Sequence, residues 1–171
     1  DTALARHLEN DPYFVRFAND LNRLSPPLNP YAELEEAGPM TPQKVRENVE
    51  YAASYIGAAW NGDSWDSPIM IALHRSARDE LGLTDTYDRP GGQVEEKAQE
   101  VYQQHGRGLK AYARAVYEMT QAFLAKHGVE SVHVYRGMGF QKPPENFAMA
   151  TATRATIKQL PLSPFTTKPN V

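Results

Sequence analysis

The sequence contains no cysteine. This absence excludes disulfide frameworks, thiolate nucleophiles and cysteine-based zinc sites. No apolar run approaches the roughly 20 residues that a membrane-spanning helix needs, so we expect a soluble chain without a transmembrane segment. An excess of positive charge is also missing, because 18 basic residues face 21 acidic ones and the net charge is −3. Non-specific binding to nucleic acid is therefore not expected, although nucleic acid as a substrate stays open.

The two ends of the chain lack the features of natural termini. The sequence begins with Asp1 rather than methionine, and it ends at Val171 directly after an expected strand. Its first ten letters, DTALARHLEN, form an amphipathic pattern rather than a signal peptide, which leaves the compartment unknown. We expect the 171 residues to be part of a longer protein, folded as one domain or as one domain with part of another.

A proline directly follows a side chain that can cap a helix at three places: Asp11-Pro12, Thr41-Pro42 and Ser67-Pro68. At each place the oxygen of the capping side chain can accept a backbone N–H, and the proline takes the first helical position. Apolar residues at helical spacing follow each proline. The sequence therefore predicts three helices with these starts, and Gly82 is expected to end the third one.

Two further helices are expected after Gly92. Residues 94–105 form a weak apolar stripe that includes His105, and residues 109–124 form a strong one. Gly106 and Gly108 are expected to separate the two helices. The stretch 25–42, with five prolines, is expected to be an irregular connection.

The pattern changes from helical to alternating near Gly128. Apolar and polar side chains alternate over residues 131–135, and they alternate again over residues 156–162. These two stretches are expected to be strands, with residues 140–150 as a loop between them. The expected fold class is therefore α+β, with an N-terminal helical region followed by strands.

An arginine and a glycine, Arg136 and Gly137, stand where the first expected strand ends. A guanidinium that is partly desolvated without an anion is unfavourable, so Arg136 is expected to have an anionic partner. Two N–H groups of its planar guanidinium can donate in parallel to two phosphate oxygens, and Gly137 lets a ligand approach the backbone closely. The pair therefore suits a pyrophosphate.

Here the sequence resembles the mono-ADP-ribosyltransferases of the arginine-serine-glutamate class, which include clostridial binary toxins and vertebrate arginine-specific transferases. The match to the first motif of that family is Tyr135-Arg136-Gly137. The second motif, a strand of the Ser-Thr-Ser type after an aromatic residue, is matched by Phe165-Thr166-Thr167, with Ser163 as the leading hydroxyl in another alignment. Lys168 stands where a third hydroxyl is usual.

The resemblance implies that Arg136 and Gly137 bind the diphosphate of NAD, and that Ser163, Thr166 and Thr167 shape the nicotinamide pocket. NAD would then be the substrate whose ADP-ribose is transferred to a macromolecular acceptor, for which a protein is expected. The catalytic glutamate of the third motif is expected beyond Val171, so no catalytic residue is assigned in this chain. The implied protein is a toxin, an effector or a phage-borne enzyme.

The resemblance also implies a division of the chain. Residues 1–40 would form a helical extension with a proline-rich connection, and residues 41–171 would form the transferase-like domain. That domain would contain a helical layer, 41–128, and the first strands of a split β-sandwich, 131–171, whose C-terminal part is missing from this chain.

Other interpretations stay open beside this one. The domain can be a catalytically inactive structural or binding module, such as part of a phage particle or a toxin docking component, or a plain helical interaction domain. Arg136 can be a surface arginine that pairs with an acidic neighbour. Arg107, Lys110 and Arg114 can contact an anion, although a solvated helix face is favoured for them. The five histidines show no pair at metal-ligand spacing, so no metal site is expected.

Overall fold

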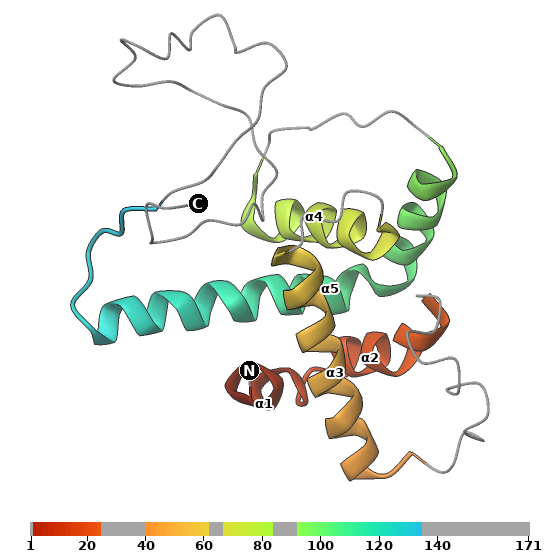
Figure 1. Ribbon diagram of the computed structural model, residues 1–171, viewed down its shortest axis with the longest axis horizontal. Coiled ribbons are helices and arrows are strands. Elements are labelled where there is room, and N and C mark those ends of the chain that lie inside the picture. Colours follow the sequence, from red (N-terminus) through yellow and green to blue (C-terminus); the bar gives the residue numbers. More distant parts are fainter. Residues whose placement is uncertain (1, 25–39, 62–66, 84–91, 135–171) are drawn as a thin grey trace, which may run out of the picture.

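A computed structural model of the chain describes residues 2–24, 40–61, 67–83 and 92–134. This part of the protein contains five helices (Figure 1). Their bounds are Thr2–Leu8 for α1, Pro12–Leu24 for α2, Pro42–Asn61 for α3, Pro68–Leu81 for α4 and Gln93–Lys126 for α5. None of these helices has the length and apolar character needed to cross a membrane.

Helices α2, α3 and α4 begin at the prolines that the sequence predicts. The Asp11 carboxylate accepts hydrogen bonds from the N–H groups two and three residues further on, at 2.9 and 2.8 Å. The hydroxyls of Thr41 and Ser67 each accept one from the N–H group three residues further on. Gly82 ends α4 in the left-handed conformation, with φ of 64°. These caps satisfy backbone groups that helix ends leave without partners, and the predicted starts are confirmed.

Helix α5 is the element on which the others are assembled. Helices α2 and α4 both pack against it, and α3 packs against α1 and α2. Figure 1 shows α4 along one side of α5 and α2 on the other side. Arg75 of α4 meets Glu95 near the start of α5, whereas Glu80 meets Arg114 further along, so the two helices run in the same direction.

The core is centred on the aromatic side chains between α2 and α5. Phe14 and Phe17 of α2 are completely buried. The Phe14 ring stacks on Tyr112 with 6.0 Å between centroids, and the Phe17 ring meets His105 edge-on at 5.8 Å. Burial of one such side chain contributes about 1.5–3 kcal/mol. Other large residues of the same core are Leu21, Val49, Ile56, Ile69, Leu73 and Leu109.

The expected break at Gly106 and Gly108 is absent, because α5 is one continuous helix of 34 residues. A Cβ at Gly108 would lie 2.6 Å from the carbonyl oxygen of Tyr13 and 3.1 Å from the Cα of Phe14. Glycine is therefore required here for the backbone of α2 to touch α5. Glycine inside a helix costs about 1 kcal/mol relative to alanine, and the burial of the α2 aromatics offsets that cost.

The expected α+β fold class is wrong for the described part of the chain, which contains five helices and no strand. Residues 131–134, expected to begin the first strand, have no regular secondary structure and their side chains are exposed. The alternation of Val132 and Val134 with polar neighbours is too short to specify a strand, and no neighbouring described segment offers backbone groups for pairing. The second expected strand, 156–162, lies outside the described residues.

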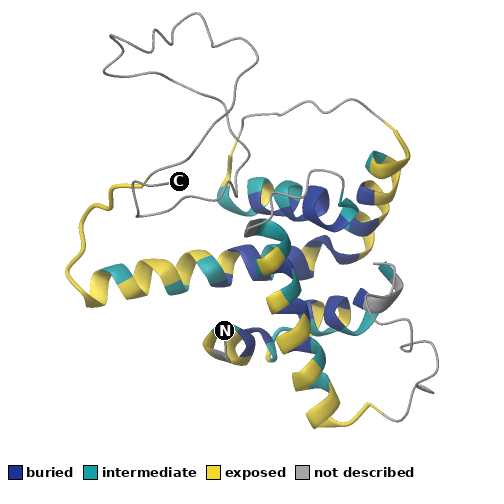
Figure 2. Cartoon of the chain, viewed as in Figure 1, coloured by how far each residue is buried: buried dark blue, intermediate teal, exposed yellow. Residues whose placement is uncertain are grey.

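The last third of α5 projects beyond the other helices. The buried residues of α5 all lie at or before Ala115, and Tyr117 and Phe123 are 52% and 61% exposed (Figure 2). The helix ends in a turn at Gly128, whose φ of 62° is left-handed. The predicted end of the helical pattern near Gly128 is confirmed, and the division of the chain into domains stays a prediction.

The close contact at Gly108 gives a stability test. We expect Gly108→Ala to lower the free energy of unfolding by about 1–3 kcal/mol, because a Cβ there overlaps the α2 backbone. Gly57→Ala in α3 is the matched control, since the nearest atom, the Tyr112 hydroxyl oxygen, is 3.8 Å away. That control is expected to leave stability unchanged or to raise it by up to about 1 kcal/mol. Equal changes in the free energy of unfolding for both variants, measured by urea unfolding, would show that Gly108 does not touch the α2 backbone.

Candidate functional site

The residues predicted to bind NAD lie outside the described part of the chain. These residues are Arg136, Gly137, Ser163, Thr166 and Thr167. Their arrangement therefore stays a prediction. The described residues contain no group of three or more His, Asp or Glu side chains that could hold a metal ion.

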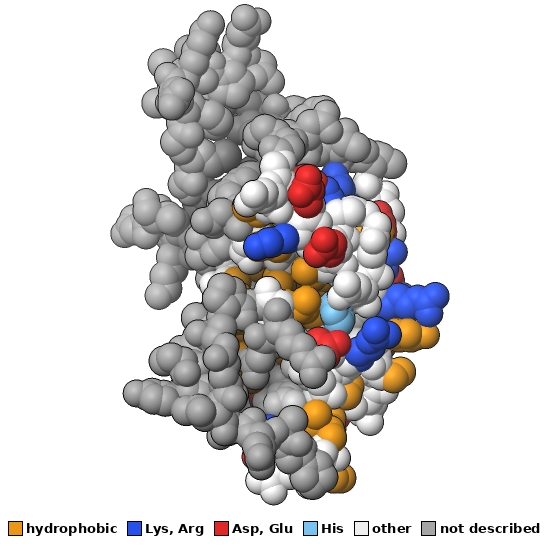
Figure 3. All heavy atoms as spheres, turned by 90° about the vertical axis from the view of Figure 1, so that its right-hand side faces the viewer, with side chains coloured by type: hydrophobic (Ala, Val, Ile, Leu, Met, Phe, Trp, Pro, Cys, Tyr) orange, Lys and Arg blue, Asp and Glu red, His pale blue; other side chains and the backbone are white. Residues whose placement is uncertain are grey.

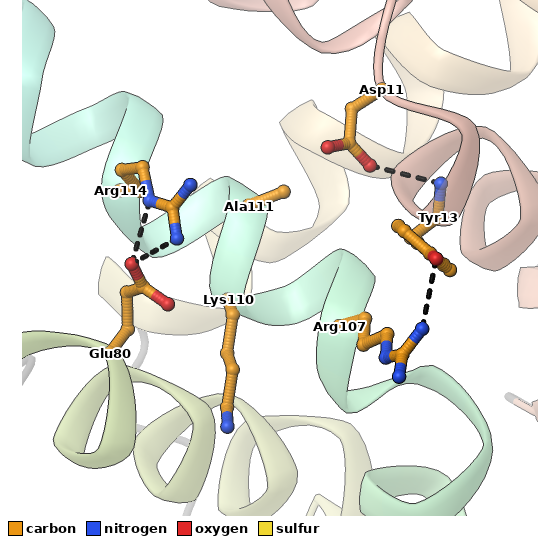
Figure 4. A pocket seen from close by; sticks show the side chains of 7 residues that line it. All are labelled: Asp11, Tyr13, Glu80, Arg107, Lys110, Ala111 and Arg114. Carbon is orange, nitrogen blue, oxygen red and sulfur yellow. Dashed lines mark hydrogen bonds and ion pairs between the residues drawn. The ribbon is translucent and has the colours of Figure 1, made fainter.

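A cavity of about 310 Å³ lies where α2, α4 and α5 meet (Figure 4). The start of α2 contributes its capping residue and an aromatic ring, the end of α4 contributes a carboxylate, and the middle of α5 contributes three cations. The charged and aromatic residues of the lining are Asp11, Tyr13, Glu80, Arg107, Lys110 and Arg114. The cavity brings five charged side chains together and is a candidate site.

The three cations of the cavity come from a single face of α5. Arg107, Lys110 and Arg114 are separated by three and four residues, and this spacing places side chains on the same side of a helix. The sequence favoured a solvated helix face for them. The structure agrees for Arg107 and Arg114, which are exposed, whereas Lys110 is half-buried. All three also line the cavity, because α2 and α4 pack on either side of this face.

Arg114 has a carboxylate partner from α4. Its Nε donates to Oε1 of Glu80 at 2.6 Å, and a second guanidinium nitrogen contacts the same oxygen. The Glu80 hydrogen bond and charge raise the pKa of Arg114. Because the Arg114 side chain is 59% exposed, solvent screens this pair and its contribution to stability is small.

Lys110 belongs to a small network with Asp79 and Tyr102. Its ammonium lies 3.2 Å from the Asp79 carboxylate, which also accepts a short hydrogen bond from the Tyr102 hydroxyl. The Tyr102 hydrogen bond is the main cause of a lowered pKa of Asp79, with burial opposing it, and the same bond raises the pKa of Tyr102. The network joins α4 to α5, and it neutralises the charge of Lys110.

Arg107 differs from the other two cations of the cavity. Its guanidinium donates a hydrogen bond to the Tyr13 hydroxyl at 2.9 Å and lies 5.1 Å from the centre of the Tyr13 ring. No carboxylate within the described residues forms an ion pair with it. Asp11, an acidic residue of the same lining, caps α2. Arg107 is therefore held in place by a neutral partner.

The face of the molecule shown in Figure 3 carries no extended field of one charge among its described residues. On the side of the molecule that faces the viewer in Figure 3, acidic and basic side chains of the described residues are interspersed. This distribution agrees with the small net charge of the chain, −3. Any preference of the cavity for an anion must therefore come from the local contacts of Arg107 rather than from long-range attraction.

A buried histidine, His105, lies one helical turn before Leu109 in α5. It is 4% exposed, and its Nε2 lies 3.8 Å from the carboxylate of Asp20. Its Nδ1 has no hydrogen-bond partner among the described residues. Burial lowers the pKa of His105, with Asp20 opposing and Arg16 reinforcing that shift. The apolar stripe in the sequence already placed this histidine on the buried face.

Comparisons with protein-family models, with curated proteins and with solved structures find no match to this chain. The function must therefore be inferred from the residues themselves. The sequence pointed to the three cations of α5 as a group, but it gave no sign of Tyr13 or Glu80 as neighbours. Those two come from α2 and α4, and only the packing of the helices brings them to α5.

The buried histidine predicts how stability depends on pH. The unfolded chain protonates His105 near its ordinary pKa of 6.5, whereas the folded chain resists protonation because its pKa is lowered. The unfolded state thus binds more protons as the pH falls below 6.5, and the contribution to stability is lost there. We expect His105→Gln to lose less stability than wild type between pH 7 and pH 5 in urea unfolding. Equal losses in the two proteins would contradict the burial of this side chain.

Proposed function

We propose that this chain supplies the NAD-binding part of a mono-ADP-ribosyltransferase, which transfers ADP-ribose from NAD to a macromolecular acceptor. The observation that carries the proposal is a pair of sequence motifs in the order of that family. Tyr135-Arg136-Gly137 comes first, and the hydroxyl-bearing stretch from Ser163 to Thr167 follows about 30 residues later. An arginine followed by a glycine is common, and the order and spacing of the two motifs raise the match to moderate specificity.

The chemistry of the two motifs suits NAD. The guanidinium of Arg136 can donate two parallel hydrogen bonds to the diphosphate. The hydroxyls of Ser163, Thr166 and Thr167 can accept and donate hydrogen bonds around the nicotinamide. In the transfer itself the bond between the ribose and the nicotinamide nitrogen breaks, its electron pair leaves with the nicotinamide, and the acceptor forms the new bond to the ribose carbon.

The positive charge that develops on the ribose needs an anionic partner, and such charge stabilisation is the largest catalytic term in many enzymes. The family resemblance gives this role to the glutamate of the third motif. No such motif follows Thr167 in this sequence. We propose NAD binding as the part of this function that the residues of this chain perform.

A second candidate function is a catalytically inactive structural or binding module. Two departures from the family pattern favour it: threonine stands at Thr166 where serine is usual, and Lys168 replaces the third hydroxyl. Such a module would bind NAD weakly or not at all, and it would transfer nothing. The two functions are thus separated by two measurements, one of NAD affinity and one of transfer.

The first measurement is NAD affinity, by calorimetric titration of the full 171-residue chain. We expect Arg136→Ala to weaken binding at least about tenfold, because charge-assisted hydrogen bonds to the diphosphate are lost. Arg136→Lys is expected to weaken it as well, since an ammonium lacks the planar fork. Arg154→Ala, which removes an arginine between the two motifs, is the matched control and is expected to bind NAD as wild type does.

The second measurement is transfer of label from adenylate-labelled NAD to the proteins of a cell lysate by the full-length protein. We expect labelling by wild type and its loss in Arg136→Ala and Arg136→Lys. Equal labelling by wild type and Arg136→Ala would show that this arginine is wrongly assigned. NAD binding without any labelling would favour the inactive module.

A further inference from the structure

We propose that the cavity between α2, α4 and α5 binds the phosphate group of a small ligand, with Arg107 as the residue that holds it. This site is separate from the motifs that suggest NAD binding, because every residue of its lining belongs to the helical part of the chain. The inference therefore does not rest on the proposed transferase function.

Arg107 has more hydrogen-bond donors than the described residues use. A guanidinium has five N–H donors in a fixed planar fork. One nitrogen donates to the Tyr13 hydroxyl at 2.9 Å, and this is the single hydrogen bond of the side chain within the described residues. The guanidinium carbon also lies over the Tyr13 ring, 5.1 Å from its centroid. Donors of a positioned cation thus stay free for an anion.

Two of the three cations that line the cavity are paired with carboxylates. Lys110 faces Asp79 and Arg114 faces Glu80, so these two cations are neutralised within the protein. The carboxylate of Asp11 accepts two backbone N–H bonds at the positive end of α2. Arg107 is the cation of the lining that has no carboxylate partner among the described residues. An oxyanion in the cavity would accept hydrogen bonds from the guanidinium of Arg107 and balance its charge.

The size and the construction of the cavity indicate the class of ligand. A volume of about 310 Å³ lies at the lower end of the range of roughly 300–1,000 Å³ that small-molecule sites occupy. A phosphate with a small organic group fits this space, whereas a folded partner does not. The backbone beneath the cavity is fixed, because the Gly108 contact holds the Tyr13 backbone against α5. A fixed backbone loses little freedom on binding.

A phosphate is preferred over a carboxylate because further donors border the same space. Lys110 and Arg114 lie on the same face of α5 as Arg107 and line the same cavity (Figure 4). Both keep N–H donors that their carboxylate partners do not use. The three non-bridging oxygens of a phosphate ester can accept from more than one of these side chains, whereas a carboxylate has two oxygens.

The test is titration of the full chain with inorganic phosphate. Binding is monitored through the NMR signals of the backbone amides and of the arginine Nε–H groups. We expect saturable shifts at Arg107, Lys110 and Arg114, and weaker binding of acetate at the same ionic strength. Shifts that rise without saturation, or that are equal for phosphate and acetate, would overturn the proposal.

Variants assign the binding to the guanidinium. Arg107→Ala is expected to weaken phosphate binding about tenfold or more, because charge-assisted hydrogen bonds are lost. Arg107→Lys keeps the positive charge but lacks the planar guanidinium, and we expect it to weaken phosphate binding about threefold or more. Arg46→Ala, at an exposed position of α3, is the matched control and should bind as wild type does.

If Arg107→Ala fails to fold, Arg107→Lys decides, and wild-type affinity in that variant overturns the assignment. Arg136→Ala distinguishes this site from the one proposed for NAD. We expect that variant to keep the phosphate-induced shifts at Arg107 whether or not it binds NAD. Loss of those shifts in Arg136→Ala would contradict an independent site.

Discussion

The contact between the start of α2 and the middle of α5 is the constraint on which the rest of the structure depends. Gly108 leaves room for the backbone of α2 at a distance that no side chain would permit. Through this contact Phe14 and Phe17 enter the core, and Tyr13 reaches Arg107. One missing Cβ therefore supports both the hydrophobic core and one wall of the cavity, so stability and the candidate site share the same physical origin.

Local charge pairing, rather than net charge, gives the cavity its character. The chain as a whole is slightly acidic, and charges of both signs are interspersed on its surface (Figure 3). Within the cavity two cations have carboxylate partners from α4, whereas Arg107 is held by the hydroxyl and the ring of Tyr13. Selectivity for an anion is then expected to act at short range and, because Arg107 is exposed, to weaken as the salt concentration rises.

The sequence predicted the helix starts correctly because a cap depends on neighbouring residues. Asp11, Thr41 and Ser67 each bond to N–H groups within three residues. The role of Gly108 could not be predicted in this way, because the atoms that require a glycine are more than 90 residues away in the sequence. The cavity was missed for the same reason. The strand expected from residue 131 was wrong over its described part, 131–134, because alternation alone does not supply a pairing partner. The NAD motifs lie outside the described residues.

The core and the three cavity cations are spread along α5, so both require α5 to be one helix. Amide hydrogen exchange over residues 104–112 of the full chain tests this most directly. A continuous, buried helix predicts slow exchange through Gly106 and Gly108, with protection close to that of global unfolding. Fast exchange confined to this stretch, between two protected segments, would show two separate helices and would contradict both the assembly on α5 and the cavity built on it.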